Sequence, residues 1–307
     1  MNAHVVSELV VVSGKGGTGK TSVVASFAAL ARNKALADCD VDAADLHLIL
    51  EPTIERREPF SGGSRAAVVS EECFSCGRCA TLCRYGAIDM TGPANDLVQS
   101  TYRIDPLRCE GCGVCAHFCP VQAIAFEPAV NGEWYVSETR HGPMVHARLG
   151  AAEENSGKLV ATVRNEAKRL AETRGLSLSI IDGSPGIGCP VIASISGATL
   201  VLIVTEPTPS GLHDMDRVAD LAAHFGIPSV VCVNKCDLNP EGTRQIEERC
   251  LARSLDVIGW LRYDASVTQA QMRGLSVVEH CSGPAAQDVT NLWDAVSSRL
   301  ATQQTCI

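Results

Sequence analysis

Eight residues near the start of the chain restrict its fold more than any other segment. They read Gly-Lys-Gly-Gly-Thr-Gly-Lys-Thr over positions 14–21 and satisfy the pattern G-x-x-x-x-G-K-[ST]. An apolar stretch, residues 8–13, precedes them, and a segment of helical character, residues 20–32, follows. Strand, glycine loop and helix in that order predict the opening of a β-α-β unit that holds phosphate at the helix N-terminus.

This loop predicts a site for a nucleotide and Mg²⁺. Lys20 is expected to contact the β and γ phosphates, and the Thr21 hydroxyl to bind Mg²⁺. The alternative, a glycine-rich turn without a ligand, does not explain why a strand and a helix flank the pattern. The residues expected to bind the nucleotide here are Gly14, Gly16, Gly17, Thr18, Gly19, Lys20, Thr21 and Ser22.

Apolar strands and helical segments alternate along the rest of the chain. Strands are expected at residues 178–182, 199–205 and 229–234, and helices at residues 158–174 and 213–225. This alternation predicts an α/β fold with a mostly parallel sheet and ligands at the C-terminal ends of the strands.

Two cysteine runs interrupt this pattern and repeat each other at an interval of 36 residues. Each run has the spacing C-x2-C-x2-C-x3-C, which is that of bacterial ferredoxins with two [4Fe-4S] clusters. Because the fourth cysteine of such a run binds the other cluster, the sequence predicts one set of Cys73, Cys76, Cys79 and Cys119 and a second set of Cys109, Cys112, Cys115 and Cys83.

A zinc module or a disulfide framework accounts for the cysteines less well. A zinc site divides its ligands into two separated pairs, and a disulfide framework needs an oxidising compartment, for which this chain carries no export signal. Arg84 stands where a proline would follow Cys83, which removes a rigid turn but no ligand. We therefore expect an α+β ferredoxin-like domain at residues 64–127, inserted between two parts of an ATPase domain, residues 1–63 and 128–307.

Composition limits the partners. The formal net charge is −9, which disfavours binding to nucleic acid or to an anionic membrane. No apolar run reaches the length of a membrane-spanning helix, so a cytoplasmic protein is expected. The last helical segment, residues 291–300, has apolar residues at helical spacing but no basic face, which favours core packing over a membrane anchor.

The glycine loop resembles a known family through its additional lysine. The sequence K-G-G-x-G-K-T, with Lys15 as first lysine, is similar to the deviant Walker motif of the MinD, ParA and nitrogenase iron-protein superfamily. The resemblance implies that Lys15 crosses a dimer interface to the partner's nucleotide. It also implies that Asp40 and Asp42 are carboxylates of the first switch segment and that Asp182 is the aspartate of the second. Local hydrogen bonding at a strand end remains the alternative for Asp40 and Asp42.

A second resemblance concerns the nucleotide base. Residues 234–237 read Asn-Lys-Cys-Asp and look like the N-K-x-D element that contacts the base in nucleotide-binding proteins. Asn234 and Asp237 are therefore expected at the base, and Lys15 favours adenine over guanine. Capping of the loop is the alternative for Asn234.

The chain as a whole resembles MinD-superfamily ATPases with an inserted ferredoxin domain, a group related to Mrp-type ATPases. The segments at residues 142–149, 154–158 and 182–190 are similar to the family's own, although Ser184 stands where the family commonly has a proline. Cys189 lies seven residues after Asp182, the offset at which the nitrogenase iron protein has a cysteine that binds a bridging cluster. No second cysteine matches; His146 could substitute, or Cys189 could be a structural thiol.

Two classes of function remain. The first is an iron-sulfur ATPase, working as a homodimer or with a paralogous ATPase, that couples ATP hydrolysis to cluster assembly or transfer or to electron delivery to a client protein. The second is a positioning ATPase of the ParA or MinD kind with purely structural clusters. A basic DNA-binding face or an amphipathic membrane helix would favour the second, and neither is evident in the sequence.

Overall fold

The computed structural model describes residues 6–150 and 156–304 and separates them into two compact units. The first unit comprises Met1–Glu58, Trp134–Arg148 and Ser156–Ile307, and the second comprises Pro59–Glu133 and Leu149–Asn155. The segment at residues 154–158 that resembles the family is described only from Ser156 onward.

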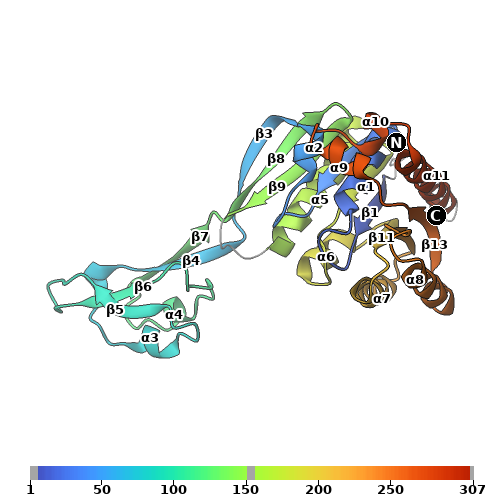
Figure 1. Ribbon diagram of the computed structural model, residues 1–307. Coiled ribbons are helices and arrows are strands. Elements are labelled where there is room, and N and C mark those ends of the chain that lie inside the picture. Colours follow the sequence, from blue (N-terminus) through green and yellow to red (C-terminus); the bar gives the residue numbers. More distant parts are fainter. Residues whose placement is uncertain (1–5, 151–155, 305–307) are drawn as a thin grey trace. The chain divides into compact units, whose positions relative to one another are not determined.

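A sheet of nine strands forms the centre of the first unit (Figure 1). From β13 to β9 all neighbouring strands are parallel, which confirms the predicted α/β fold with a mostly parallel sheet. In spatial order the strands are β13 (Asp256–Leu261), β12 (Ser229–Asn234), β11 (Leu200–Thr205), β1 (Ser7–Val12), β10 (Leu178–Asp182), β2 (Lys34–Asp38), β9 (Gly142–Leu149), β8 (Gly132–Thr139) and β3 (Thr53–Phe60).

Helices cover both faces of this sheet. The first face carries α1 (Lys20–Leu30), α2 (Leu46–Leu50), α9 (Ala265–Gln271), α10 (Val277–His280) and α11 (Pro284–Gln304). The opposite face carries α5 (Ser156–Arg174), α6 (Cys189–Ile195), α7 (Pro209–His224) and α8 (Pro240–Ala252) (Figure 1). No helix of the described chain is both long enough and apolar enough to cross a membrane.

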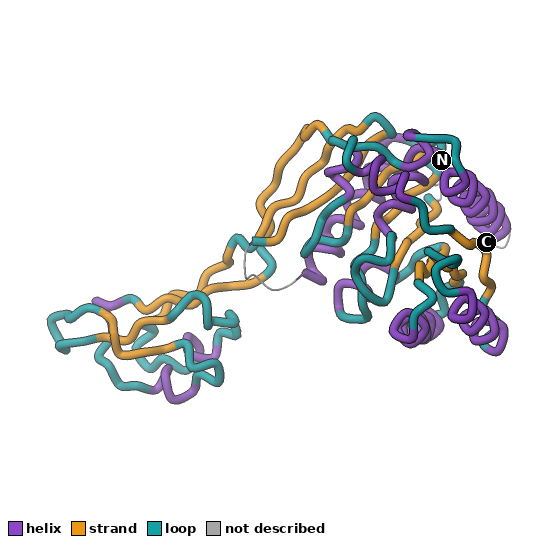
Figure 2. Tube along the Cα trace, viewed as in Figure 1, coloured by secondary structure: helices purple, strands orange, loops and turns teal. Residues whose placement is uncertain are grey.

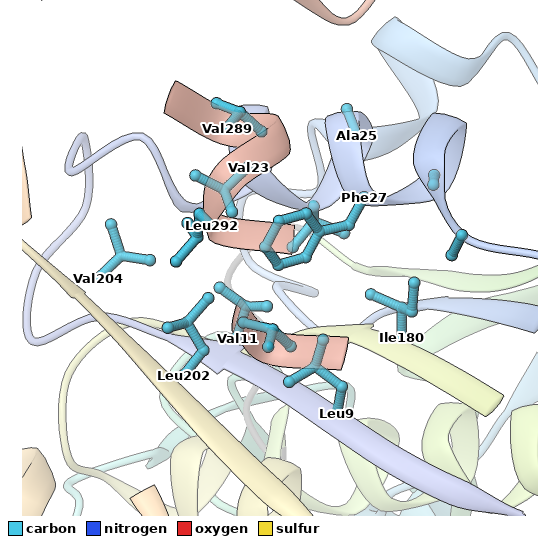
Figure 3. Close-up of a cluster of buried hydrophobic side chains, with 14 of the residues drawn as sticks. Leu9, Val11, Val23, Ala25, Phe27, Ile180, Leu202, Val204, Val289 and Leu292 are labelled. Carbon is cyan, nitrogen blue, oxygen red and sulfur yellow. The ribbon is translucent and has the colours of Figure 1, made fainter. Parts of the chain in front are cut away.

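A large hydrophobic cluster lies between the sheet and the first helix layer (Figure 3). Phe27 of α1 is fully buried, and its ring lies 4.9 Å from that of Trp293 of α11. Leu292 and Val296 of α11 are buried in the same cluster, which confirms that the last helix packs in the core. Truncation of a buried phenylalanine to alanine costs about 3–5 kcal/mol, so Phe27→Ala is expected to destabilise the first unit by about that amount.

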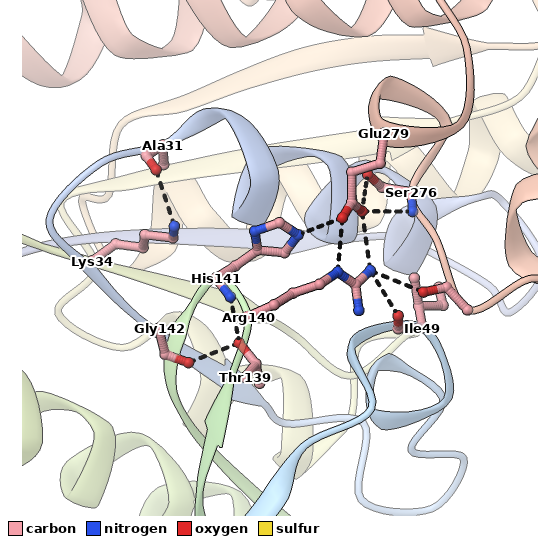
Figure 4. A network of polar contacts seen from close by, with 10 residues as sticks. Ala31, Lys34, Ile49, Thr139, Arg140, His141, Gly142, Ser276 and Glu279 are labelled. Carbon is pink, nitrogen blue, oxygen red and sulfur yellow. Dashed lines mark hydrogen bonds and ion pairs between the residues drawn. The ribbon is translucent and has the colours of Figure 1, made fainter.

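A polar network joins the turn between β8 and β9 to the first helix layer (Figure 4). Arg140 donates to the Glu279 carboxylate at 2.7 Å and to the carbonyl oxygens of Ile49 and Gly274. His141 lies 2.8 Å from the same carboxylate, and Ser276 completes a capping box with Glu279 at the start of α10. Burial alone would raise the pKa of Glu279, but the hydrogen bonds from Arg140 and Ser276 outweigh it and lower the pKa to about 2.

The second unit consists mainly of loops, with short strands and helices (Figure 2). Two antiparallel pairs form it, β4 (Gly63–Val68) with β7 (Ile124–Ala129) and β5 (Ile88–Gly92) with β6 (Thr101–Ile104). Its short helices are α3 (Arg78–Leu82) and α4 (Val114–His117). A small cluster of Ala66, Ile88, Ile104 and Ile124 is its apolar core, and several cysteines pack against it.

Candidate functional site

The glycine loop lies between β1 and α1 at the C-terminal edge of the sheet and lines a cavity of about 470 Å³. Gly19 precedes α1 with φ of 88°, a backbone conformation that favours glycine. A Cβ atom at this position would lie 2.3 Å from Nδ2 of Asn234, so a larger residue would displace that side chain. Of the residues expected at the nucleotide, Gly16, Gly17, Thr18, Gly19, Lys20, Thr21, Ser22 and Asn234 line this cavity, whereas Gly14 and Asp237 do not.

Lys20 is buried among carboxylates that come from two other strands. Its Nζ lies 2.5 Å from Oδ1 of Asp182 and 3.5 Å from Oδ2 of Asp40. Burial alone would lower the pKa of Lys20, but the charges of Asp182 and Asp40 outweigh it and raise the pKa, so the ammonium stays charged at neutral pH. The structure thus brings together three residues that lie far apart in the sequence.

Asp38, which the sequence patterns did not single out, belongs to the same group. It is the last residue of β2 and stands opposite Asp182 in the register of β2 and β10. Its carboxylate accepts hydrogen bonds from the backbone N–H groups of Asp40 and Leu46, which shapes the segment between β2 and α2. Burial and the Asp182 charge raise its pKa well above the ordinary value. Its place at the C-terminal end of a parallel strand was the signal that could have identified it.

Two buried oxygen atoms beside Lys20 lack a hydrogen-bond partner within the described chain. They are Oδ2 of Asp182 and Oγ1 of Thr18. An unpaired buried oxygen costs about 1–3 kcal/mol, so both positions are suited to a polar ligand. The loop glycines, the charged lysine and the Thr21 hydroxyl supply the groups that a Mg²⁺-bound triphosphate requires. Asp42, by contrast, is exposed and does not line the cavity.

Lys15 contacts residues of its own chain that lie after β11 and in α7. Its Nζ lies 3.2 Å from Oγ of Ser210 and 3.6 Å from Oε2 of Glu206, and its side chain is 35% exposed. Glu206, which follows β11, also pairs with Lys235. Exposed contacts of this kind contribute little free energy, so Lys15 can leave them at low cost. Glu206 is a second residue that the sequence patterns missed.

The opposite end of the cavity is formed by the loop after β13 and by α9 and α11. It is lined there by Arg262, Tyr263, Asp264, Val267, Thr268, Gln271, Ala285 and Val289. Asn234 donates from Nδ2 to the carbonyl oxygen of Thr18 at 2.7 Å, and Asp237 accepts from the backbone N–H of Tyr263 at 2.7 Å. Both residues of the N-K-x-D segment therefore hold loops that form the cavity.

The second unit gathers the eight cysteines of the two runs into two separate sets. Cys73, Cys76, Cys79 and Cys119 line one cavity, and Cys83, Cys109, Cys112 and Cys115 line another. Gly77 and Gly113, with φ of 76° and 74°, are the N-cap residues of α3 and α4, which carry the third cysteine of each run. In the described residues no group of three or more His, Cys, Asp or Glu side chains has the spacing for a single metal ion.

The thiol donor set of each cavity fits a [4Fe-4S] cluster. Four cysteines with no other metal-binding side chain among them, apart from one glutamate at the second cavity, form the surroundings that such clusters require. Burial raises the pKa of the Cys79 and Cys115 thiols, and the neighbouring thiols of each set raise it further. Iron bound to the thiolates would offset this cost.

The remaining metal candidates, Cys189 and His146, have separate surroundings. Cys189 is exposed at the start of α6, where its Cβ lies near Gly157 of α5. His146 is buried on β9, with Nε2 2.9 Å from Oγ of Ser137 and its ring stacked on Tyr135. Burial and the nearby His47 lower the pKa of His146 to about 4. A metal at either residue stays a prediction.

Comparisons with known proteins agree with this geometry. The family model "CobQ/CobB/MinD/ParA nucleotide binding domain" matches residues 9–277. The Uncharacterized protein MJ0578 of Methanocaldococcus jannaschii is 31% identical over 245 residues, which cover 76% of this chain and 80% of that protein. A segment of 57 residues is 37% identical to the Pyruvate synthase subunit PorD of Methanothermobacter marburgensis and covers 19% of this chain and 58% of that subunit.

Solved structures share the fold at low sequence identity. The MinC:MinD cell division complex of Aquifex aeolicus gives a TM-score of 0.56 at 18% identity and covers 95% of this chain and 96% of that one. The cell division ATPase MinD of Pyrococcus furiosus gives 0.54 at 16% identity and covers 95% and 98%. Together with the family model, which spans most of the sequence, these similarities lead to one conclusion. The chain belongs to the CobQ/CobB/MinD/ParA family of nucleotide-binding proteins.

Proposed function

We propose that the chain is an ATPase that carries two [4Fe-4S] clusters and couples ATP binding and hydrolysis to electron delivery or to transfer of an iron-sulfur or metal cluster to a client protein. The observation that carries the proposal is the pair of four-cysteine cavities in a chain that also holds a nucleotide-binding loop. When bound, such clusters accept and donate single electrons.

The nucleotide chemistry follows from the residues around Lys20. The backbone N–H groups of the loop and the N-terminus of α1 bind phosphate oxygens, and the charged Lys20 turns from Asp182 to the β and γ phosphates. The Thr21 hydroxyl binds Mg²⁺. Asp40, whose pKa is raised mainly by burial, is the carboxylate that orients the attacking water in this proposal. When the nucleotide binds, Asp182 exchanges its contact with Lys20 for one with the ligand. This exchange changes the conformation of the segment after β10 according to which nucleotide is bound.

Dimerisation belongs to the same proposal. We infer that Lys15 leaves Ser210 and Glu206 when two chains meet and stabilises charge on the nucleotide of the partner, as an arginine finger does. The dimer consists of two copies or of this chain with a paralogous ATPase. Coupling then requires the ATP and ADP states to bind the client with different affinities.

The test begins with the cofactor content of anaerobically purified protein. We expect about eight iron and eight sulfide per chain, as two cubane clusters require. Cys119→Ser and Cys83→Ser test the division of the cysteines, because each is expected to disturb the cluster bound by the other run. Iron near zero, or one metal ion bound per four cysteines, would exclude the iron-sulfur part of the proposal.

A positioning ATPase with structural clusters is the second candidate, favoured by the fold shared with proteins named MinD. The two candidates differ in the response of the ATPase to the clusters. If the hydrolysis rate is the same with oxidised and reduced clusters, and the protein binds a surface or polymer in an ATP-dependent way, the second candidate is correct.

A further inference from the structure

The internal repeat of the second unit allows its two cysteine cavities to be compared position by position. Cys73 matches Cys109, so residue 78 matches residue 114 and residue 74 matches residue 110. The matched residues differ in charge: arginine at position 78 corresponds to valine at 114, and phenylalanine at 74 corresponds to glutamate at 110. All four residues line their own cavity.

Apart from cysteines, each cavity is lined by a single charged side chain in the described chain. For the first cavity, with Cys73, Cys76, Cys79 and Cys119, it is Arg78, the first residue of α3. For the second, with Cys83, Cys109, Cys112 and Cys115, it is Glu110. The repeat therefore places a cation at the first site where the second has the uncharged Val114.

Other charged residues of this unit, Arg84 after Cys83 among them, lie outside the linings of the two cavities. Arg78 forms no ion pair with a described residue, and its guanidinium lies 5.7 Å from the centre of the Phe118 ring. The arginine beside the second run, Arg108, does not line the cavity and is paired with Asp89 and Asp105. The acidic residues at positions 71 and 72, which precede the first run, are exposed and do not line the first cavity.

A charge beside a cluster changes its reduction potential because reduction adds one negative charge to it. A nearby cation stabilises the reduced form and raises the potential, whereas a carboxylate lowers it. We propose that Arg78 makes the cluster held by Cys73, Cys76, Cys79 and Cys119 the more easily reduced of the two. The inference rests on the proposed function. It also sets the direction of electron transfer between the two clusters, from the second site to the first.

Exposed apolar residues line both cavities, and at the second they are Tyr85 and Val114. Phe74, Phe118 and Val121 are all exposed, and Phe74 and Val121 line the same cavity as Arg78. What distinguishes the first site is therefore the exposed Arg78, whose charge matches carboxylates on a redox partner.

The test is a redox titration of the full-length, cluster-loaded protein, followed by electron paramagnetic resonance. We expect two midpoint potentials. Arg78→Val introduces the residue of the matched position and is expected to move the higher potential to a more negative value and leave the lower one unchanged. Val114→Arg, the reciprocal change, is expected to move the lower potential to a more positive value. Arg78→Lys, which keeps the charge, is the control and should preserve both potentials.

The same variants define the result that would overturn the inference. Because Arg78 is exposed, the effect of Arg78→Val should be larger at low ionic strength than at high ionic strength. If Arg78→Val shifts the lower potential, or neither, while both clusters remain bound, the inference is wrong. Absence of clusters in the unaltered protein would instead refute the proposed function, so the two failures are distinguishable by iron analysis.

Discussion

The hydroxyl of Ser184 donates a hydrogen bond of 2.6 Å to the backbone carbonyl of Cys39. Cys39 lies between Asp38 and Asp40 after β2, and Ser184 follows Asp182 after β10, so this bond joins the two segments whose aspartates surround Lys20. The backbone N–H of Cys39 also donates to the carbonyl oxygen of Asp182. A proline at position 184 would offer no hydroxyl for this contact.

Removal of this hydroxyl tests its role. Ser184→Ala is expected to lower the free energy of unfolding by about 1 kcal/mol, the usual contribution of one hydrogen bond, and to reduce kcat for ATP hydrolysis more than it changes KM. Ser179→Ala is the matched control, because Ser179 is equally buried on β10 and its hydroxyl has no partner among the described residues. Equal effects of the two substitutions in urea unfolding and ATPase assays would show that the bond has no particular role.

Lys15→Ala tests action across a dimer. The lysine makes only partly exposed contacts with its own chain, so we expect unchanged stability and unchanged iron content. Loss of a cation at the transferring phosphate should lower kcat at least tenfold, by analogy with an arginine finger, and leave nucleotide affinity nearly unchanged. Steady-state ATPase assays at several protein concentrations measure this. A kcat within twofold of the unaltered protein would contradict the role given to Lys15.

Glu279→Gln tests the polar network that Glu279 forms with Arg140 and His141. The low pKa of Glu279, about 2, means that the folded state favours its ionised form, so this stabilisation is present above about pH 4.3 and is lost as the pH falls toward 2. At pH 7 the substitution should cost about 2 kcal/mol in urea unfolding, after allowance for partial exposure. Glu248→Gln, which removes an exposed ion pair with Arg244, should cost less than about 0.5 kcal/mol.

The lowered pKa of His146 predicts that the free energy of unfolding also depends on pH in a less acidic range. Its pKa of about 4 in the folded state lies below the ordinary value of about 6.5, so the unfolded chain binds more protons between these values. Titration of His146 does not reduce the free energy of unfolding above about pH 6.5. It lowers this free energy by up to about 3 kcal/mol as the pH decreases toward 4. His146→Gln should flatten the curve of unfolding free energy between pH 7 and pH 5, whereas His213→Gln, at an exposed site, should not.

Much of the fold could be predicted because its determinants are local. The strand predicted at residues 229–234 is β12, and the helix predicted at residues 158–174 is α5. Each follows from an apolar pattern within one segment. By contrast, the place of β8, β9 and β3 at one edge of the sheet depends on pairings over long distances in the sequence, which no local pattern predicts.

In the candidate site, too, contiguous sequence patterns were predicted, whereas residues that depend on contacts between strands were not. The glycine loop and the two cysteine runs are contiguous patterns, so their residues could be grouped from spacing alone. Asp38 and Glu206 were missed because their importance arises only when neighbouring strands end side by side. Asn234 was expected at the base, and the structure shows in addition that it holds the loop through Thr18, a contact between residues 216 positions apart.

The proposed function requires that ATP hydrolysis and the oxidation state of the clusters depend on each other. The most direct test is the ATPase rate of anaerobic, fully loaded protein before and after reduction of the clusters, with Lys20→Ala as the control for hydrolysis by contaminants. Coupling between hydrolysis and the clusters predicts a severalfold difference in kcat between the oxidised and reduced protein and no measurable activity in the Lys20→Ala variant. Equal rates in both oxidation states, with about eight iron bound per chain, would contradict it.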